Sequence, residues 1–132
     1  MASSIRRLGA LVLGVALALA TPGLARARDL EPLMHGWEQH LSITWNPVQQ
    51  HGRTEIEGYV INRSPYRFGR LRVLVDSLDD AGRIVDQRVS WVHGELPGDS
   101  RLYFEVPVKP ASNYRVSVFS YDRLEEFSMM LP

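Results

Sequence analysis

The sequence predicts an all-β fold, an antiparallel β-sandwich of about six to seven strands, and three observations lead to this prediction. Apolar and polar residues alternate with a period of two over several short stretches, as in strands that bury one face. Turn-forming residues separate these stretches roughly every ten to fifteen residues, which is typical of two-layer antiparallel folds. No internal repeat or low-complexity segment interrupts the pattern.

The first 27 residues are predicted to be a Sec-type signal peptide. Arg6 and Arg7 form a basic start, and the apolar run that follows is too short to span a bilayer as a mature helix. Ala25 and Ala27 fit a cleavage site near Ala27, and the arginine pair leaves the twin-arginine route open. We therefore expect a periplasmic or secreted protein with three parts: a signal peptide (1–27), an N-terminal extension (28–40) and a β-sandwich domain (41–132).

Composition narrows the classes of partner. All fifteen acidic residues but only twelve of the fifteen basic ones follow residue 27, which gives the mature chain a net charge of −3. Such a charge does not attract nucleic acid or anionic membranes. The chain has no cysteine, so it forms no disulfide. We expect no membrane span in the mature chain and no cofactor.

The N-terminal extension is expected to be irregular and to lead directly into the first strand. Proline and glycine in the extension argue against a stable helix, so Leu33 and Trp37 are expected to pack on the domain as a loose turn. The first strand, His40–Trp45, alternates cleanly. Asn46 and Pro47 are expected to end it.

The next two strands carry the clearest alternation. Thr54–Asn62 follows a turn and stops at the sequence Asn-Arg-Ser-Pro, a strong loop signal. Arg70–Leu78 is the third strand. Its predicted inward residues are Leu71, Val73 and Val75.

An Asp-Asp-Ala-Gly loop leads into the fourth strand, Arg83–Val92. Gly82 is expected to take the left-handed conformation that closes such a hairpin. Val85, Val89 and Trp91 are in phase along the strand, so Trp91 is expected in the core, as is Trp45 on the first strand. Trp37 is then the one tryptophan free to stack on a sugar.

The last elements follow a loop with a Pro97-Gly98 pair, the composition of a type II turn. Arg101–Val108 is the fifth strand, and its proline confines its far end to a sheet edge. Tyr114–Tyr121 is the sixth strand, and Glu125–Met130 is a short candidate seventh.

Four pieces of the sequence resemble the FxLYD-type domains of exported bacterial proteins. They are "GYVINRS" (58–64), "DDAGRIV" (79–85), "ELPGDSRLYFEV" (95–106) and "YRVSVFSYD" (114–122), which together cover roughly residues 41–122. Of the motif that names the family, Asp79 is the matching position. The resemblance implies an immunoglobulin-like β-sandwich that is exported and has no enzymatic role.

A basic and aromatic run is the most distinctive candidate surface. Its members are Arg63, Tyr66, Arg67, Arg70 and Arg72. Guanidinium groups that share a strand face can dock an acidic partner, a sugar acid or a phosphate. The alternative is that outward charge protects an edge strand from aggregation.

Metal binding is a second candidate function. If the fold brings His35 and His40 together with Met34, Met129 and Met130, these residues would form a soft ligand set that suits copper. Their spacing matches no helical or strand metal motif. A second set, Asp76, Asp79 and Asp80, could hold calcium, although a hairpin turn with solvated acids is the favoured explanation.

No catalytic pattern is visible. There is no G-x-S-x-G, and adjacent acids on a strand point to opposite faces and cannot act as a pair. We therefore expect an exported, non-catalytic protein with a binding or structural role, whose partner is another envelope or secreted protein. The alternative is a periplasmic module that binds a small ligand or a metal, copper or calcium.

Overall fold

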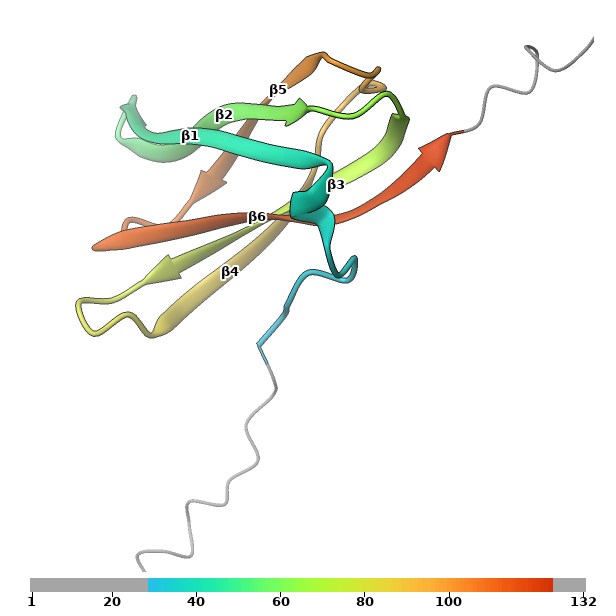
Figure 1. The fold of residues 1–132 in the computed structure, drawn as a ribbon. Helices are drawn as coiled ribbons and strands as arrows, with labels where there is room; N and C mark the ends of the chain where they lie inside the picture. The colour runs from blue at the N-terminus through green and yellow to red at the C-terminus, as the bar shows by residue number, and fades with distance from the viewer. Residues whose placement is uncertain (1–28, 125–132) are drawn as a thin grey trace, which may run out of the picture.

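The two sheets of the protein are stacked as layers in the computed structural model, which describes residues 29–124 (Figure 1). One sheet has the strand order β1-β2-β5 and the other β4-β3-β6, and every pairing is antiparallel. The elements are η2 (Trp37–Gln39), β1 (Leu41–Gln50), β2 (Arg53–Asn62), β3 (Arg67–Leu78), β4 (Ile84–Trp91), β5 (Arg101–Val108) and β6 (Asn113–Leu124). The predicted all-β sandwich is confirmed. The predicted signal peptide and seventh strand lie outside the described residues.

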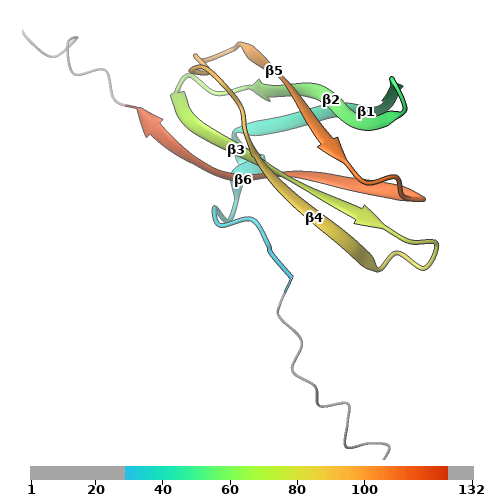
Figure 2. The same cartoon turned by 180° about the vertical axis from the view of Figure 1, so that it is seen from behind.

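The core lies between the two layers, which Figure 2 shows from behind. Alternation in β2 buries Ile56 and Val60, and alternation in β3 buries Val73 and Val75, all without solvent exposure. Each fully buried aliphatic side chain contributes roughly 1.5–3 kcal/mol through removal of apolar surface from water. The period-two pattern therefore selects the buried faces of the two central strands, as predicted.

The strand β1 runs through its proline instead of ending there. Pro47 lies opposite Ile56 within a regular antiparallel pairing that continues to Gln50. Because β1 is the edge of its sheet, a residue without an N–H group can be accommodated there. The prediction that Asn46 and Pro47 end the strand was therefore wrong.

Of the two predicted glycine-containing turns, one has the expected backbone conformation and the other does not. Gly82 has a φ of 81°, so the predicted left-handed closure of the β3–β4 hairpin is confirmed. The predicted type II turn at Pro97-Gly98 is wrong, because the left-handed residue of that loop is Asp99, with a φ of 56°. Glycine is needed at 98 for a different reason: a Cβ there would collide with the backbone carbonyl of Ser64.

The extension crosses the β4-β3-β6 sheet and is tied to it. The side chain of Gln87 exchanges two hydrogen bonds with the backbone of Leu30, and the Leu33 amide donates to the Phe119 carbonyl at 2.8 Å. Trp37 packs against the core, so it is not the free stacking residue that the sequence suggested. Among residues 29–124, no helix has the length and apolar character needed to cross a membrane.

Candidate partner-binding surface

A β-bulge in β3 positions the two arginines of the predicted surface. Gly69 pairs with Asp122 of β6 and Arg72 pairs with Ser120, so two residues of β3 lie opposite one of β6. Arg70 is in this bulge and has a φ of 49°, a left-handed conformation that costs a residue with a Cβ free energy. Bulges of this kind re-aim side chains and are common beside functional sites.

Both arginines lie over the indole ring of Trp91. The guanidinium carbon of Arg70 is 5.6 Å from the ring centroid, and that of Arg72 is 5.0 Å away. Arg72 is also 5.0 Å from the Phe119 ring and donates from Nε to the Ser120 hydroxyl at 2.8 Å. It is therefore held between two aromatic rings, with its orientation fixed by a hydrogen bond.

The prediction that Trp91 lies in the core was wrong. Its side chain is 50% exposed, whereas the phase of the strand predicted a core position. Trp91 pairs with Arg72 and Val89 pairs with Leu74, so both β4 residues share the outer face of the sheet. Trp45 is closer to the prediction, because it is partly buried against the core and packs edge to face on Tyr114.

The other three residues of the predicted surface lie elsewhere, at one end of the sandwich. Tyr66 is partly buried against the core and has the Arg123 guanidinium 3.5 Å above its ring. Arg67 forms an ion pair with Glu95 at 2.9 Å, and Arg63 donates to the Ser42 hydroxyl at 3.3 Å. The five residues therefore do not form one patch: Arg70 and Arg72 lie on the outer face, and the remaining three surround the loop before β3.

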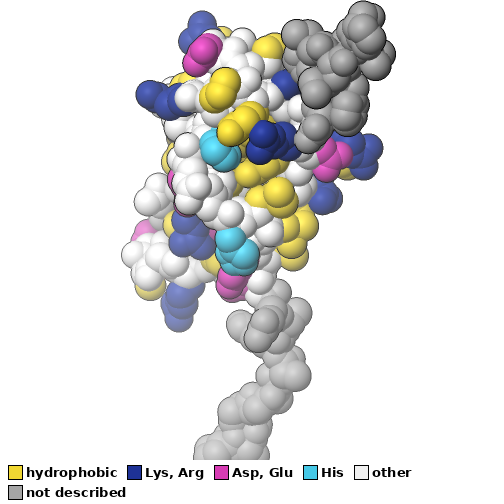
Figure 3. All heavy atoms as spheres, turned by 45° about the vertical axis from the view of Figure 1, so that its right-hand side comes forward, with side chains coloured by type: hydrophobic (Ala, Val, Ile, Leu, Met, Phe, Trp, Pro, Cys, Tyr) yellow, Lys and Arg dark blue, Asp and Glu magenta, His cyan; other side chains and the backbone are white. Residues whose placement is uncertain are grey.

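His35 and His40, which were considered for metal binding, lie beside aromatic and aliphatic side chains. The His40 ring is 5.4 Å from Tyr66 and 6.0 Å from Phe68, in aromatic contacts at the same end of the sandwich. Figure 3 shows histidine, basic and hydrophobic side chains next to one another on this side of the molecule. His35 lines a shallow hollow beside the extension, with Leu33 and Phe119.

Two of the three aspartates considered for calcium, Asp76 and Asp79, have their oxygens engaged. Asp76 is only 3% exposed and binds Arg115 at 2.8 Å and the Gln87 amide. Asp79 accepts from the Ala81 and Arg83 amides of its own hairpin, and the bond from the Arg83 amide is the largest effect that lowers the pKa of Asp79. Turn chemistry therefore explains Asp79, and contacts with the two neighbouring strands explain Asp76.

The opposite outer face, on the β1-β2-β5 sheet, carries an acidic group that the sequence did not reveal. Glu55, Glu57 and Glu105 place carboxylate oxygens within 4.8 Å of one another, and they form the one such group of three among residues 29–124. Glu57 lies directly opposite Glu105 in the β2–β5 pairing. Tyr103 donates to Glu105 at 2.9 Å, and desolvation together with these charges raises the pKa of Tyr103 well above its usual range.

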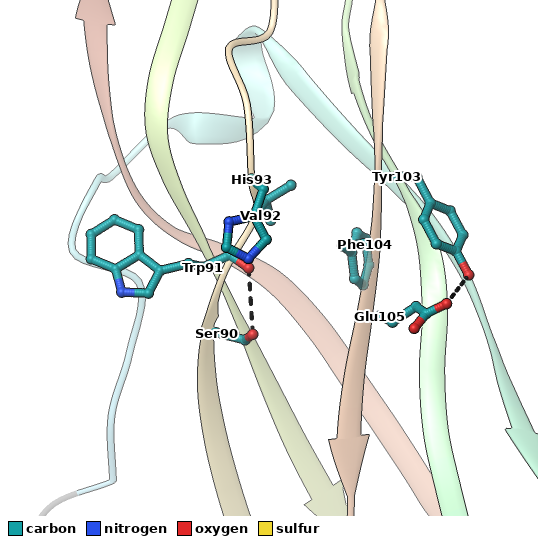
Figure 4. A pocket seen from close by; sticks show the side chains of 7 residues that line it. All are labelled: Ser90, Trp91, Val92, His93, Tyr103, Phe104 and Glu105. Atoms are coloured by element: carbon teal, nitrogen blue, oxygen red, sulfur yellow. Dashed lines mark hydrogen bonds between the residues drawn. The ribbon is translucent and has the colours of Figure 1, made fainter. Parts of the chain in front are cut away.

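A hollow of about 390 Å³ opens between the edge strands β4 and β5. Its lining includes Val92 and Phe104 from the core, with Ser90 and His93 beside them. Figure 4 shows that Trp91 projects to one side of this hollow while Tyr103 and Glu105 project to the other. The hollow therefore separates the basic outer face from the acidic one.

No model of a known protein family matches this chain, and neither does any curated protein or solved structure.

The contacts that define the surface were missed because they join residues far apart in the sequence. Arg72 meets Trp91 and Phe119 only through the register of β3 with its two neighbours. One signal was present in the sequence: the fourth strand carries Asp86, Arg88 and Ser90 on the face opposite Trp91. Both faces of that strand are mixed in polarity, which is typical of an edge strand.

Proposed function

We propose that this chain is an exported, non-catalytic protein of the cell envelope that docks a protein partner on the outer face of the β4-β3-β6 sheet. The docking surface consists of Trp91, Arg70, Arg72 and Phe119. Export rests on the predicted leader, and the lack of catalysis rests on the sequence patterns and on the FxLYD-like resemblance. The partner is another envelope or secreted protein.

One observation carries the proposal: a half-exposed tryptophan with two guanidinium groups over its ring. Tryptophan and arginine are the residue types that most often dominate binding energy at protein interfaces. Exposure of a large aromatic ring to water contributes nothing to folding, so a partner that covers Trp91 would gain apolar burial.

The orientation of the two arginine side chains, fixed before any partner binds, supports the same surface. Arg72 is already held between the rings of Trp91 and Phe119, so little side-chain entropy remains to be lost on binding. The left-handed conformation of Arg70 is a local cost that aims its side chain over Trp91. Strain of this kind is concentrated at binding and catalytic sites.

The experiment places a photo-crosslinking residue at position 91, identifies the crosslinked protein, and measures its binding to purified variants. We expect Trp91→Ala and Arg72→Gln each to weaken binding by at least about tenfold, since a hot-spot residue contributes roughly 2 kcal/mol or more. Arg63→Gln is the matched control, because Arg63 lies outside the docking surface. Equal binding by all three variants would refute the proposed surface.

A further inference from the structure

The two outer faces of the sandwich each carry one exposed aromatic anchor. Trp91 is 50% exposed on the β4 side and Tyr103 is 44% exposed on the β5 side. Both line the hollow between these edge strands, yet they project to opposite sides of it (Figure 4). The anchors therefore lie at a similar height along the strands, on outer faces that meet at one seam.

The charges beside the two anchors are complementary. Arg72, next to Trp91, forms no ion pair with any acidic residue between 29 and 124; its polar partner is the Ser120 hydroxyl. Glu57 and Glu105, next to Tyr103, belong to the group of three carboxylates, none of which is paired with a Lys or Arg of the described chain. Arg72 on one face and the three carboxylates on the other thus each lack an oppositely charged partner within the described chain.

We infer that the surface around Trp91 also binds a second copy of this chain, in a two-fold dimer across the β4–β5 seam; this inference rests on the proposed function. A two-fold axis along the strand direction exchanges the two layers and preserves height along the strands. It therefore lays the outer face of β5 beside the outer face of β4 of the second copy. Trp91 of each copy then meets Tyr103 of the other, and the contact is made twice, as a closed two-fold interface requires.

Spacing and charge fit this arrangement. Arg72 pairs with Trp91 across β3 and β4, and Glu105 lies two residues from Tyr103 on the same face of β5, so contact between the two aromatic anchors brings these long side chains toward each other. The approach of a guanidinium also offsets the repulsion between Glu57 and Glu105, which face each other directly in the monomer. The net charge of −3 after residue 27 is small, so overall charge opposes the association only weakly.

Side chains carry the contact, since the edges themselves are poor templates for pairing. Pro107 in β5 lacks an N–H group, and Arg88 in β4 lies opposite Val75 and so shares the core-facing side of its sheet. Proline and inward-pointing charge both hinder the continuation of a sheet into another chain. The dimer is therefore expected to depend on charge and on ionic strength.

The test is analytical ultracentrifugation of the purified protein across a range of concentrations and salt. The expected result is a twofold increase in mass with concentration at low ionic strength, lost near 1 M salt, where the Debye length falls to about 3 Å. Arg72→Glu and Glu105→Arg should each weaken association at least about tenfold. An equimolar mixture of the two variants, or the double variant, should restore it, because the reversed charges again meet opposite ones.

Arg53→Glu is the control, since Arg53 lies at the β1–β2 hairpin, away from the seam. Circular dichroism of each variant, together with recovery in the double variant, separates loss of the interface from loss of the fold. A monomeric mass at every concentration overturns the dimer, as does a double variant no better than the single ones. A monomer that still loses its crosslinked partner on Trp91→Ala leaves the proposed function standing, whereas a dimer indifferent to Arg72→Glu and Trp91→Ala refutes the surface itself.

Discussion

At the scale of single residues, Arg70 shows how the backbone serves the outer face. Its left-handed φ of 49° is a conformation that costs a residue with a Cβ roughly 1–2 kcal/mol. Its ion pair with Asp122 at 3.1 Å is exposed on both sides and offsets at most about 1 kcal/mol of this. The bulge therefore costs stability that the side-chain contacts of the monomer only partly return.

We predict that the free energy of unfolding of Arg70→Gly is about 1 kcal/mol higher than that of Arg70→Ala. Both variants lose the same side-chain contacts, so the difference reports the backbone conformation alone. At Arg53, which has no positive φ, the order should reverse, and glycine should be roughly 0.5–1 kcal/mol worse than alanine. Urea denaturation measures all four variants, and the same order at both positions would contradict the strain at Arg70.

Asn62 is the residue that joins two loops at one end of the sandwich. Its side chain is 1% exposed, and its Nδ2 donates to the carbonyls of Tyr66 at 2.7 Å and Pro97 at 3.0 Å. Its Oδ1 accepts from both the amide and the hydroxyl of Ser64, at 3.0 and 2.7 Å. The amide of Asn62 thus joins the loop at Ser64 and Tyr66 to the loop at Pro97.

Asn62→Ala is expected to lower the free energy of unfolding by about 2–3 kcal/mol, because it leaves buried polar groups unsatisfied. Asn62→Asp should be no better, since a carboxylate cannot donate to the two carbonyls and would be a buried charge. Chemical denaturation provides the measurement. Asn46→Ala on the exposed side of β1 should stay within about 0.5 kcal/mol of the wild type. An Asn62→Asp variant as stable as wild type would show that the donated bonds contribute nothing.

At the scale of strands, alternation predicts which segments are extended but leaves open which face is buried. In β2 and β3 the middle of one face is apolar, so its inward residues were predicted correctly. In β4 the apolar residues Val89 and Trp91 lie on the outer face, because the strand is at the edge and the core is already closed by its neighbours. The site was harder to predict from the sequence, because the contact between Arg72 and Trp91 depends on the register of the strands, which no local pattern encodes.

The β2–β5 pairing makes a prediction about charge. Like charges directly opposite each other in a sheet destabilise it, so Glu57→Lys should raise the free energy of unfolding by roughly 0.2–1 kcal/mol. Thermal denaturation at low ionic strength measures the gain, and high salt should reduce it. Glu38→Lys on the extension changes the net charge equally but faces no cross-strand carboxylate, so it should give no such gain. A gain of equal size from Glu38→Lys would attribute the effect to net charge instead.

At the scale of the molecule, the extension covers one outer face while the seam between β4 and β5 stays open. The extension is anchored at Gln87 of β4 and at Phe119 of β6, so it spans the sheet from one edge to the other. Trp37, near the end of the extension, packs against the core. Asp76 is buried under this arrangement while its partner Arg115 stays largely exposed, and Trp91 is left uncovered.

Removal of the chain before Leu41 should therefore leave a folded but weaker sandwich. The loss of Trp37 packing is expected to cost about 1–3 kcal/mol of unfolding free energy, within the range for burial of one large side chain. Leu33→Ala alone should be nearly neutral, because the Leu33 side chain is exposed and its hydrogen bond uses the backbone. Urea denaturation compares these chains, and hydrogen exchange at the Leu33 amide of the intact protein reports whether the extension opens locally before the sandwich unfolds. Exchange of that amide as slow as the amides of β3 would make the extension part of the cooperative core, and the truncated chain should then fail to fold at all.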